Sequence, residues 1–333
     1  MTRDRLAVML ERITHVHAGV IGDFCLDAYW ELDTRAPEAS LETGKPTRSV
    51  RRQRYTPGGA GNVAWNLSAL GAGSVCCFGV IAQDLFGLAL RDRLHERLID
   101  TDGLVAQPTD WDTPVYAKPY IGPEEQERID FGRENFISRG TEQDIVRKLR
   151  DGIHDLHILV VNQQLVNGVC SRVVIEGVNA IVREHPRKIF VLDARTMMEE
   201  FPGMVMKLSA VQAAGPELAP LLRLGSLGVE QIAERASAIS VRQGKPVFVT
   251  RNADGMLLCE GPKVTGIPAV PISGPTDPVG AGDTTVAAIA LGLAAGATPQ
   301  EAGELAALAA AVTVRKLRQT GTATPEEILK LAG

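Results

Sequence analysis

The feature that most constrains the fold of this chain is a repeated alternation between short apolar runs and longer helical patterns. The apolar runs are rich in Val and Ile, which favour β-strands. Alternation of this kind is typical of a mainly parallel sheet with helices on both faces. The sequence predicts strands at residues 18–21, 75–80, 158–161, 189–192, 247–250 and 256–258. It predicts helices at residues 62–70, 85–97, 142–151, 170–184, 229–242, 284–295, 299–316 and 325–331.

Composition and charge set the broad class of the protein. The 333 residues are 45% hydrophobic and 23% charged, which suits one large α/β domain over residues 1–333. The net charge of -5, with acids and bases interspersed, argues against a nucleic-acid partner. None of the five cysteines forms a Cys-x-x-Cys pair, and residues 1–12 lack the apolar core of a signal peptide. The apolar stretch at 284–297 is too short to cross a bilayer, so we expect a cytoplasmic protein without a membrane partner.

Two segments, residues 29–55 and 113–131, interrupt the alternation. Both lack a helical period, and the second contains the turn Gly122-Pro123-Glu124-Glu125. Extended strands that project from the main sheet would explain both segments. These strands would form either a small β lid that closes over a ligand or a surface insertion that does not contribute to a binding site. The pattern alone leaves both interpretations open.

A glycine-rich turn precedes the helix predicted near residue 284. Its sequence is Gly280-Ala281-Gly282-Asp283. A helix start offers free backbone N–H groups and the positive end of the helix dipole, which together bind anions such as phosphate. Asp283 would lie beside that anion and could take a proton from an attacking hydroxyl. An ordinary turn, in which Asp283 only favours the helix start, would have the same sequence.

Two more polar clusters lie near the N-terminal half of the predicted sheet. Asp23 and Asp27 follow the first predicted strand, where open α/β sheets bind ligands. Their carboxylates could accept hydrogen bonds from sugar hydroxyls, or they could only shape a turn. Further along, Gly58 and Gly59 allow the backbone to approach a small ligand closely, and Asn62 offers both a donor and an acceptor.

In chain order, the Gly22-Asp23 to Asp27 strand end, the loop from Gly58 to Asn62 and the late Gly280-Ala281-Gly282-Asp283 turn resemble the signature of the ribokinase-like carbohydrate kinases, the PfkB family. The likeness covers most of the chain. Within the family, the chain is most similar to the heptose-7-phosphate kinase half of the bifunctional lipopolysaccharide-heptose enzymes. The stretches that carry this closer likeness are residues 26–30, 35–39, 57–64, 250–256, 316–317 and 321–324. The resemblance implies an α/β, ribokinase-like three-layer sandwich with a mainly parallel sheet and a small β lid.

The resemblance also implies roles for individual residues. The catalytic group would consist of the general base Asp283 and the anion hole Gly280, Ala281 and Gly282. The sugar-binding group would be Asp27, Gly58, Gly59 and Asn62. The residues beside the nucleotide would be Thr250 and Gly255, and Asp277 would help to hold a monovalent cation such as K⁺.

The activity implied by the resemblance is transfer of the γ-phosphate of ATP, with Mg²⁺, to a hydroxyl of a sugar or sugar phosphate. A heptose-phosphate-like acceptor would fit the closer likeness. Phosphoryl transfer depends on positioning and on neutralising oxygen charge, which the glycine-rich turn and Mg²⁺ would supply. Lid strands often pair between subunits in this family, so we expect a homodimer formed through the lid.

The chain departs from the family pattern where metal and phosphate should bind. The family's Pro-Asn-x-x-Glu motif near Mg²⁺ corresponds to residues 208–212, with Ser209 and Gln212 in place of the asparagine and the acid. Two lysines of the heptose kinases are missing, although Arg195 could replace one. The segment Arg318-Gln319-Thr320 is inserted relative to the family.

These departures keep other interpretations open. A non-catalytic sugar or nucleotide sensor could retain the fold and lose turnover, and a nucleoside kinase would share most of the motifs. A basic run before the Gly58-Gly59 loop could be a solvated lid face or a clamp for an acidic sugar, since arginine binds oxyanions in a bidentate manner. The run consists of Arg48, Arg51, Arg52 and Arg54.

Overall fold

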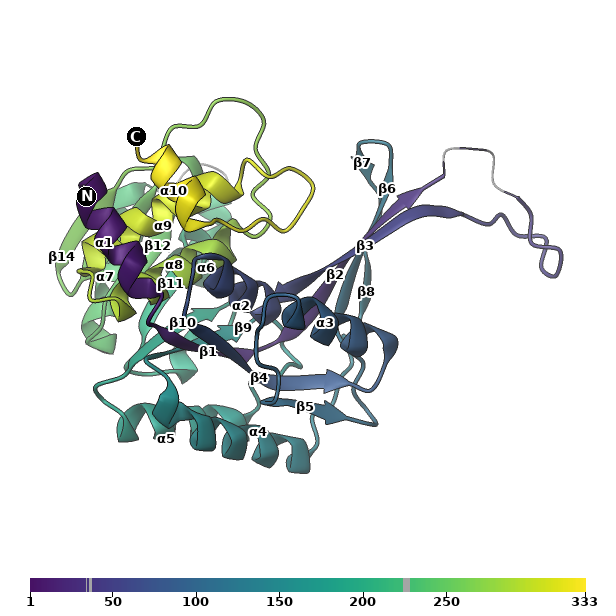
Figure 1. The fold of residues 1–333 in the computed structure, drawn as a ribbon, viewed down its shortest axis with the longest axis horizontal. Coiled ribbons are helices and arrows are strands. Elements are labelled where there is room, and N and C mark those ends of the chain that lie inside the picture. Colours follow the sequence, from purple (N-terminus) through teal and green to yellow (C-terminus); the bar gives the residue numbers. More distant parts are fainter. Residues whose placement is uncertain (34, 36–37, 224–227) are drawn as a thin grey trace.

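A nine-stranded sheet forms the centre of the computed structural model, which describes residues 1–33, 35, 38–223 and 228–333. Its strands are β1 (His17–Gly22), β4 (Ser74–Ala82), β5 (Leu104–Gln107), β9 (Ile158–Gln163), β10 (Ile189–Ala194), β11 (Val205–Ser209), β12 (Val247–Thr250), β13 (Met256–Glu260) and β14 (Lys263–Ile267). Their order is β14-β13-β12-β11-β10-β9-β1-β4-β5 (Figure 1). All neighbours from β12 to β5 run parallel, and β13 and β14 add an antiparallel edge. The prediction of a mainly parallel sheet is confirmed.

Helices cover both faces of this sheet, because its central strands are apolar on both sides. In β9, Ile158 and Val160 belong to one hydrophobic cluster, and Leu159 and Val161 belong to the other. The first cluster is covered by α1 (Arg3–Ile13), α2 (Ala60–Ala69), α3 (Leu85–His95), α8 (Ala281–Ala294), α9 (Pro299–Thr313) and α10 (Pro325–Leu331). The second is covered by α4 (Arg139–Gly152), α5 (Arg172–Glu184), α6 (Ala210–Arg223) and α7 (Val229–Gln243).

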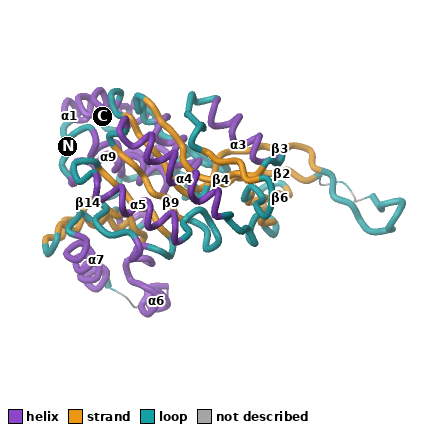
Figure 2. Tube along the Cα trace, turned by 90° about the horizontal axis from the view of Figure 1, so that it is seen from below, coloured by secondary structure: helices purple, strands orange, loops and turns teal. Residues whose placement is uncertain are grey.

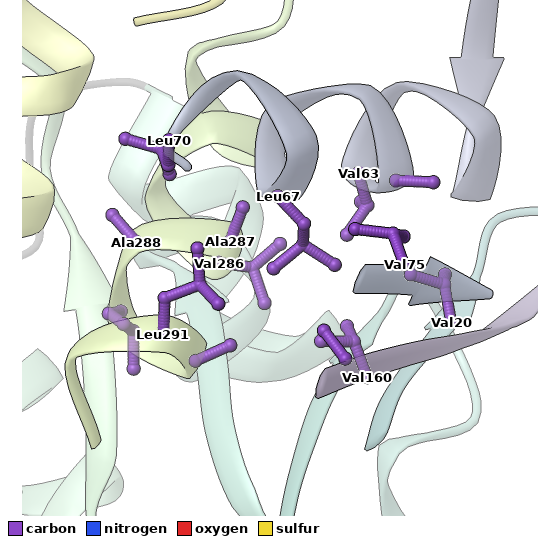
Figure 3. Close-up of a cluster of buried hydrophobic side chains, with 14 of the residues drawn as sticks. Val20, Val63, Leu67, Leu70, Val75, Val160, Val286, Ala287, Ala288 and Leu291 are labelled. Carbon is purple, nitrogen blue, oxygen red and sulfur yellow. The ribbon is translucent and has the colours of Figure 1, made fainter. Parts of the chain in front are cut away.

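The packing of α2 and α8 on the sheet determines where the polar groups at their starts will lie. Figure 3 shows Val63 and Leu67 of α2, Val286 of α8, Val20 of β1 and Val160 of β9 within one cluster of buried side chains. All of these side chains are fully buried. The N-terminal ends of the two helices are therefore held close to each other, near the carboxyl ends of the parallel strands.

A second sheet projects from the first. It consists of β2 (Phe24–Leu32), β3 (Val50–Gly59), β6 (Val115–Ile121), β7 (Glu124–Glu125) and β8 (Ile129–Phe131). The order is β3-β2-β6-β7, with β8 also paired to β6. The hairpin of β2 and β3 extends far from the body of the molecule (Figures 1 and 2). Residues 29–55 and 113–131 supply most of this sheet, and residues 34, 36 and 37 of the first segment lie outside the described residues.

The predicted elements are all present, and several unpredicted ones accompany them. Helices α1 and α6 and strands β5, β11 and β14 were not expected from the sequence. In α6, Pro216, Pro220 and Gly215, with a positive φ of 75°, interrupt the helical pattern. In β11, Lys207 interrupts the apolar run. Among the described residues, no helix is both long enough and apolar enough to span a membrane.

Candidate active site

A cavity of about 610 Å³ opens at the carboxyl ends of β10 and β11, between the main sheet, the second sheet and the start of α8. This is where open α/β sheets bind their ligands. Asp27 and Gly59 line it from the second sheet, and Gly280, Gly282 and Asp283 line it from α8. The structure therefore brings the predicted sugar-binding and catalytic segments to one cavity, although they are more than two hundred residues apart in the sequence.

The glycine-rich turn forms the first turn of α8. Gly280 is the N-cap residue and has a left-handed conformation (φ 81°), which glycine adopts without strain. The Ala281 N–H donates to the Pro278 carbonyl at 3.1 Å and closes the turn. Gly282 and Asp283 follow in the first turn, where a helix provides no carbonyl acceptor for its N–H groups. These N–H groups and the helix dipole give this wall of the cavity the character of an anion site.

Asp283 lies deep in the cavity, where only a small part of its surface reaches solvent. Burial raises its pKa from 3.8 to about 7. The charges of Asp193 and Asp27 raise the pKa further, whereas the hydrogen bond from Asn62 and the charge of Lys207 lower it. A carboxyl group with a pKa near neutrality is well matched to accept a proton from a hydroxyl.

A chain of buried polar side chains holds Asp283 in place. Asn62 Nδ2 donates to Asp283 Oδ2 at 2.6 Å. Asn66 Nδ2 in turn donates to Asn62 Oδ1 at 3.2 Å, and Thr284 Oγ1 donates to Asn66 Oδ1 at 2.6 Å. Thr313 of α9 continues the chain, with 3.0 Å between its hydroxyl and that of Thr284. A fully satisfied buried network of this kind favours a single orientation of the carboxylate.

Asp27 lies in the middle of β2 and is buried. Its Oδ1 is 3.4 Å from Lys118 Nζ, and its Oδ2 accepts a hydrogen bond from Thr320 Oγ1 at 3.1 Å. Burial raises the pKa of Asp27, and the charge of Lys118 and the Thr320 hydrogen bond oppose that rise. Gly58 lies directly against this carboxylate, since an added Cβ would be 3.3 Å from Asp27 Cγ. Gly59 has a positive φ of 53° at the end of β3, and an added Cβ would be 2.4 Å from the Asp23 carbonyl oxygen.

A buried ion pair forms the floor of the cavity. Lys207 Nζ lies 2.9 Å from Asp193 Oδ1, and both side chains are almost fully buried. Lys207 is directly below the glycine-rich turn, because a Cβ added to Gly282 would be 3.3 Å from Lys207 Nζ. Asn162, at the end of β9, directs Nδ2 toward Asp193 Oδ2 at 3.5 Å, and its buried Oδ1 has no partner among the described residues.

The cavity is lined by cationic side chains, although two lysines of the heptose kinases are missing from the sequence. Lys118 from β6, Arg128 from the segment before β8, Arg195 after β10 and Lys207 from β11 all line the cavity. Of these, only Arg195 was identified from the sequence. The alternation in β6, with buried Val115 and Ala117, places Lys118 on the opposite face and could have revealed it.

Ser209 and Gln212 form a capping box at the start of α6. The Gln212 Oε1 accepts the Ser209 N–H at 2.7 Å, and the Ser209 Oγ accepts the Gln212 N–H at 3.3 Å. The Gln212 Nε2 also donates to the Ala194 carbonyl at 2.6 Å. The amide of Gln212 therefore joins the start of α6 to the end of β10.

The remaining predicted residues lie outside the cavity lining. Thr250 ends β12 and pairs in register with Ser209, which does line the cavity. Gly255 has φ 80° in the tight connection to β13, where an added Cβ would be 2.2 Å from the Ile267 carbonyl oxygen. Asp277 accepts backbone N–H groups from Val279 at 3.0 Å and Arg318 at 2.8 Å, so its carboxylate fixes a loop.

Two hypotheses from the sequence are not supported by the geometry. Asp23 does not face the cavity, because its carboxylate accepts the backbone N–H groups of Gln164, Leu165 and Val169 at 2.7–2.8 Å. It shapes a turn, which was the alternative interpretation. The basic run lies on the exposed part of β3 and before it, and its last member, Arg54, stacks on the Tyr29 ring at 4.5 Å. The arginines that line the cavity are Arg128 and Arg195.

The family model described as pfkB family carbohydrate kinase matches residues 24–327. The chain belongs to the PfkB family of carbohydrate kinases. Two curated relatives are the proteins named "Bifunctional protein HldE" from Gluconobacter oxydans (strain 621H) and Citrifermentans bemidjiense. The first is 32% identical over 93% of this chain and 63% of its own length, and the second is 30% identical over 100% and 66%. The chain thus spans less than two thirds of the length of these relatives.

Solved structures agree with the family assignment at the level of the fold. The Arabidopsis thaliana ribokinase complexed with ribose and ATP has a TM-score of 0.69 at 20% identity, covering 96% of this chain and 99% of that one. The Escherichia coli phosphofructokinase-2 in complex with potassium has a TM-score of 0.71 at 15% identity, covering 96% and 98%. The predicted ribokinase-like sandwich and the assignment to the sugar kinases are confirmed.

Proposed function

We propose that this PfkB-family protein transfers the γ-phosphate of ATP to a hydroxyl of a phosphorylated sugar, of the heptose-phosphate type. The observation that carries the proposal is the position of Asp283. This carboxyl group, with its pKa raised to about 7, lies in the first turn of α8 and lines the same cavity as the buried carboxylate of Asp27. One cavity thus contains an anion site, a base and a group that can accept hydrogen bonds from sugar hydroxyls.

In the proposed reaction, the sugar is held by Asp27 and lies between the second sheet and α8. Asp283 takes the proton of the acceptor hydroxyl, whose oxygen forms a bond to the γ-phosphorus of ATP. The bond from that phosphorus to the bridging oxygen breaks, and ADP retains the electron pair. The N–H groups of the first α8 turn and the ammonium group of Lys207 stabilise the negative charge on the transferred group.

The cations of the second sheet support a substrate that already carries a phosphate. Lys118 Nζ is 3.4 Å from Asp27 Oδ1, on the side of the cavity opposite the main sheet. Arg128 lines the same region and is stacked over the Tyr116 ring at 4.6 Å. A neutral sugar would not require these charges beside its binding carboxylate, whereas an anionic substituent would pair with them. This favours a sugar phosphate over an unmodified sugar or a nucleoside.

The oxygen donors of the site fit a magnesium ion that is shared with nucleotide phosphates. Mg²⁺ is usually held in such sites by one or two carboxylates together with substrate phosphates. Asp193 is the donor that the floor of the cavity offers, and the unpartnered Oδ1 of the buried Asn162 belongs to the side chain that contacts Asp193. When bound, the ion would neutralise phosphate charge. Asp277, the residue expected to hold a monovalent cation, has both of its oxygens engaged by backbone N–H groups, so the K⁺ expectation gains no support from its geometry.

The second sheet is proposed to act as the lid and as the dimer contact. It carries Asp27 and Lys118 on the cavity side, so its approach to α8 would enclose the substrate. The outer part of β3 is exposed over five successive residues, which makes the projecting hairpin available to a second copy of the chain.

The experiment that tests the function measures ADP production with MgATP across ribose, fructose 6-phosphate, sedoheptulose 7-phosphate, a heptose 7-phosphate and adenosine. We expect turnover that is strongest with a heptose 7-phosphate and absent in Asp283→Asn. Turnover of adenosine or ribose alone would contradict the phosphorylated-sugar proposal. Thermal stabilisation by these compounds without ADP production, at any Mg²⁺ or Mn²⁺ concentration, would favour the non-catalytic sensor.

A further inference from the structure

Thr320 is a buried cavity residue that belongs neither to the second sheet nor to a helix of the site. It lies in the loop between α9 and α10. Its hydroxyl oxygen is 3.1 Å from each of three other oxygens: Asp27 Oδ2, Tyr29 Oη and Thr56 Oγ1. Tyr29 and Asp27 belong to β2 and Thr56 belongs to β3, so one side chain from the C-terminal region contacts the second sheet at three points.

The chemistry of these groups fixes the direction of the hydrogen bonds. An ionised carboxylate only accepts, whereas a hydroxyl has one donor and two acceptor positions. Thr320 must therefore donate to Asp27, and it accepts from Tyr29 and Thr56. All three positions of the Thr320 hydroxyl are then occupied. It has no proton left for a substrate, so it acts on the substrate through Asp27.

The loop that carries Thr320 is also joined to the glycine-rich turn. The Arg318 N–H donates to Asp277 Oδ2 at 2.8 Å, and the Asp277 N–H donates to the Val314 carbonyl at 2.8 Å. The methyl group of Thr320 packs against the turn itself, because a Cβ added to Gly280 would lie 3.1 Å from Thr320 Cγ2. One threonine therefore contacts the sugar-binding carboxylate with its hydroxyl and the phosphate-binding turn with its methyl group.

We propose that Thr320 is a positioning residue that sets the orientation of Asp27 toward the substrate and aligns it with the phosphate-binding turn. The hydrogen bond to Oδ2 leaves Oδ1, on the side of Lys118, as the oxygen offered to a sugar hydroxyl. The loop of residues 314–321 thereby becomes a determinant of sugar affinity, although it lies in neither sheet. The inference rests on the proposed function, since it takes Asp27 to be the sugar ligand.

Two matched variants separate the hydroxyl group from the methyl group. Thr320→Val keeps the shape and the contact with Gly280 but removes the donor, whereas Thr320→Ser keeps the donor and removes the methyl group. With a heptose 7-phosphate as the probe, we expect Thr320→Val to raise the sugar KM about 10- to 100-fold, because a hydrogen bond to a charged group is lost. The KM for ATP should stay within about threefold, and Thr320→Ser should retain a sugar KM close to that of the wild type.

The pH dependence provides a readout that a purely structural role would not change. The Thr320 donor stabilises the ionised form of Asp27, so its removal should move the acidic limb of sugar affinity to higher pH when Thr320→Val is compared with Thr320 in an Asp283→Asn background, where the proposed base no longer titrates. The other charged groups that face Asp27 are the same in both proteins, namely Lys118 of β6 and Arg128 of the segment before β8, while Asp283 of α8 is replaced in both. An unshifted limb, or an unchanged sugar KM in Thr320→Val, would overturn the proposal.

A second measurement does not depend on the substrate. Urea midpoints of the wild type, Thr320→Val, Asp27→Asn and the double variant form a thermodynamic cycle. If Thr320 positions Asp27, the midpoint changes will be non-additive, and additive changes would refute the contact. If no compound in the panel is turned over by the wild type while the cycle remains non-additive, the proposed function fails and the positioning of Asp27 by Thr320 stands.

Discussion

Asp283 and Asp27 line the same cavity, but their carboxylates differ in the hydrogen-bond donors and charges that surround them. Asp283 has one amide donor, Asn62, and the nearby carboxylates of Asp193 and Asp27 raise its pKa further. Asp27 has a lysine at 3.4 Å and a hydroxyl donor, both of which favour its charged form. Environments that differ in this way are consistent with the proposed division between a proton acceptor, Asp283, and a binding carboxylate, Asp27.

Replacing the proposed base should remove catalysis and leave the fold unchanged. We expect Asp283→Asn to lower kcat by about 10²- to 10⁴-fold, because the proton acceptor is lost while the shape of the side chain is kept. ATP affinity, measured by calorimetry, should change little. The control is Asp92→Asn on the exposed face of α3, which should have wild-type activity. A kcat within a few-fold of the wild type in Asp283→Asn would exclude this residue as the base.

The raised pKa of Asp283 also predicts how stability varies with pH. Between pH 3.8 and about 7, the folded protein retains a proton that the unfolded chain has released. The stability associated with that proton is lost as the pH rises toward about 7. We therefore expect Asp283→Asn to be more stable than the wild type at pH 8, by about 1–3 kcal/mol, and the difference to shrink at pH 5. Urea unfolding at both pH values tests this, and a difference that does not vary with pH would contradict it.

The rate of the wild-type enzyme should show the same ionisation. The base must be charged to accept a proton, so kcat should rise with pH through about 7 and then level off. A pH profile with saturating sugar and MgATP measures this limb. An acidic limb near the ordinary aspartate value would mean that burial does not control the ionisation of Asp283.

At the level of elements, the shape of the proposed anion site at the start of α8 depends on the conformation of one residue. Gly280 needs a positive φ of 81° to turn the chain into the helix, whereas Gly282 is already helical. The two glycines are close to different groups, since a Cβ on Gly280 would approach Thr320 and Asn62, and one on Gly282 would approach only the flexible end of Lys207. The turn therefore depends on its first glycine more than on its second.

Alanine substitutions should reveal this difference. We expect Gly280→Ala to cost about 1–2 kcal/mol of folding stability, because an L-residue is strained at this φ, and to reduce kcat. Gly282→Ala should fold normally, since the lysine end can move, and it should mainly affect ATP-dependent turnover. Urea midpoints of the two purified variants provide the comparison. Equal destabilisation by both substitutions would contradict the proposed role of the left-handed residue.

The start of α6 allows a parallel test of the capping box. In Gln212→Glu the amide that donates to the Ala194 carbonyl at 2.6 Å is replaced by a carboxylate oxygen, so we expect a loss of about 1–3 kcal/mol. The matched control is Gln231→Glu at the third helical position of α7, which is exposed and accepts the Gly228 N–H at 3.1 Å. Similar unfolding midpoints for the two variants would show that the Ala194 contact contributes nothing.

The elements predicted from the sequence were those with an uninterrupted pattern. Strands such as β9 are apolar on both faces, and α9 and α10 begin with Thr-Pro capping boxes. Two of the missed elements carry a functional or structural exception, namely the buried Lys207 in β11 and Gly215, with its positive φ, in α6. The glycine-rich turn and Asp27 were accessible because each lies in a short local motif.

Local patterns could have placed Lys118 on one face of β6, but they could not show which cations meet in the cavity or that Thr320 contacts Asp27. Lys118, Arg128 and Lys207 come from three segments that meet only after the second sheet has been placed against the first. Thr320 reaches Asp27 across 293 positions of the chain. The spacing of residues in the sequence does not predict these tertiary contacts, because they depend on how sheets and loops pack together. The resemblance could identify the family but not these contacts.

At the level of the whole molecule, the outer part of the long hairpin of β2 and β3 does not pack against the hydrophobic core. It extends away from the two helical layers (Figures 1 and 2) and carries the exposed apolar residues Leu41 and Val50. An isolated projection of this kind would gain stability from a partner, because an open hairpin leaves strand edges and apolar side chains in water.

We expect the purified protein to be a dimer with twice the 35.7 kDa mass of one chain. Light scattering after size exclusion should detect this at micromolar concentration, and Val50→Asp should shift the mass toward one chain because it places a charge in the contact. Val264→Asp on β14, at the edge of the main sheet, provides a control with similar exposure and should remain dimeric. A wild-type mass of one chain at all concentrations would refute the dimer.

The junction between the two sheets limits the motion that a lid could perform. Only Asp23 separates β1 from β2, and β3 passes directly into α2 at Ala60. These two links are adjacent, because the Ala60 N–H donates to the Asp23 carbonyl at 3.0 Å. Two further links, residues 108–114 before β6 and residues 132–138 after β8, also join the second sheet to the main body, so any lid movement is restricted at four points of the chain. If Asp27 holds the sugar as proposed, a restricted lid leaves the sugar little freedom to shift relative to Asp283, so the hydroxyl that is phosphorylated would be selected by how the sugar sits between these two carboxylates.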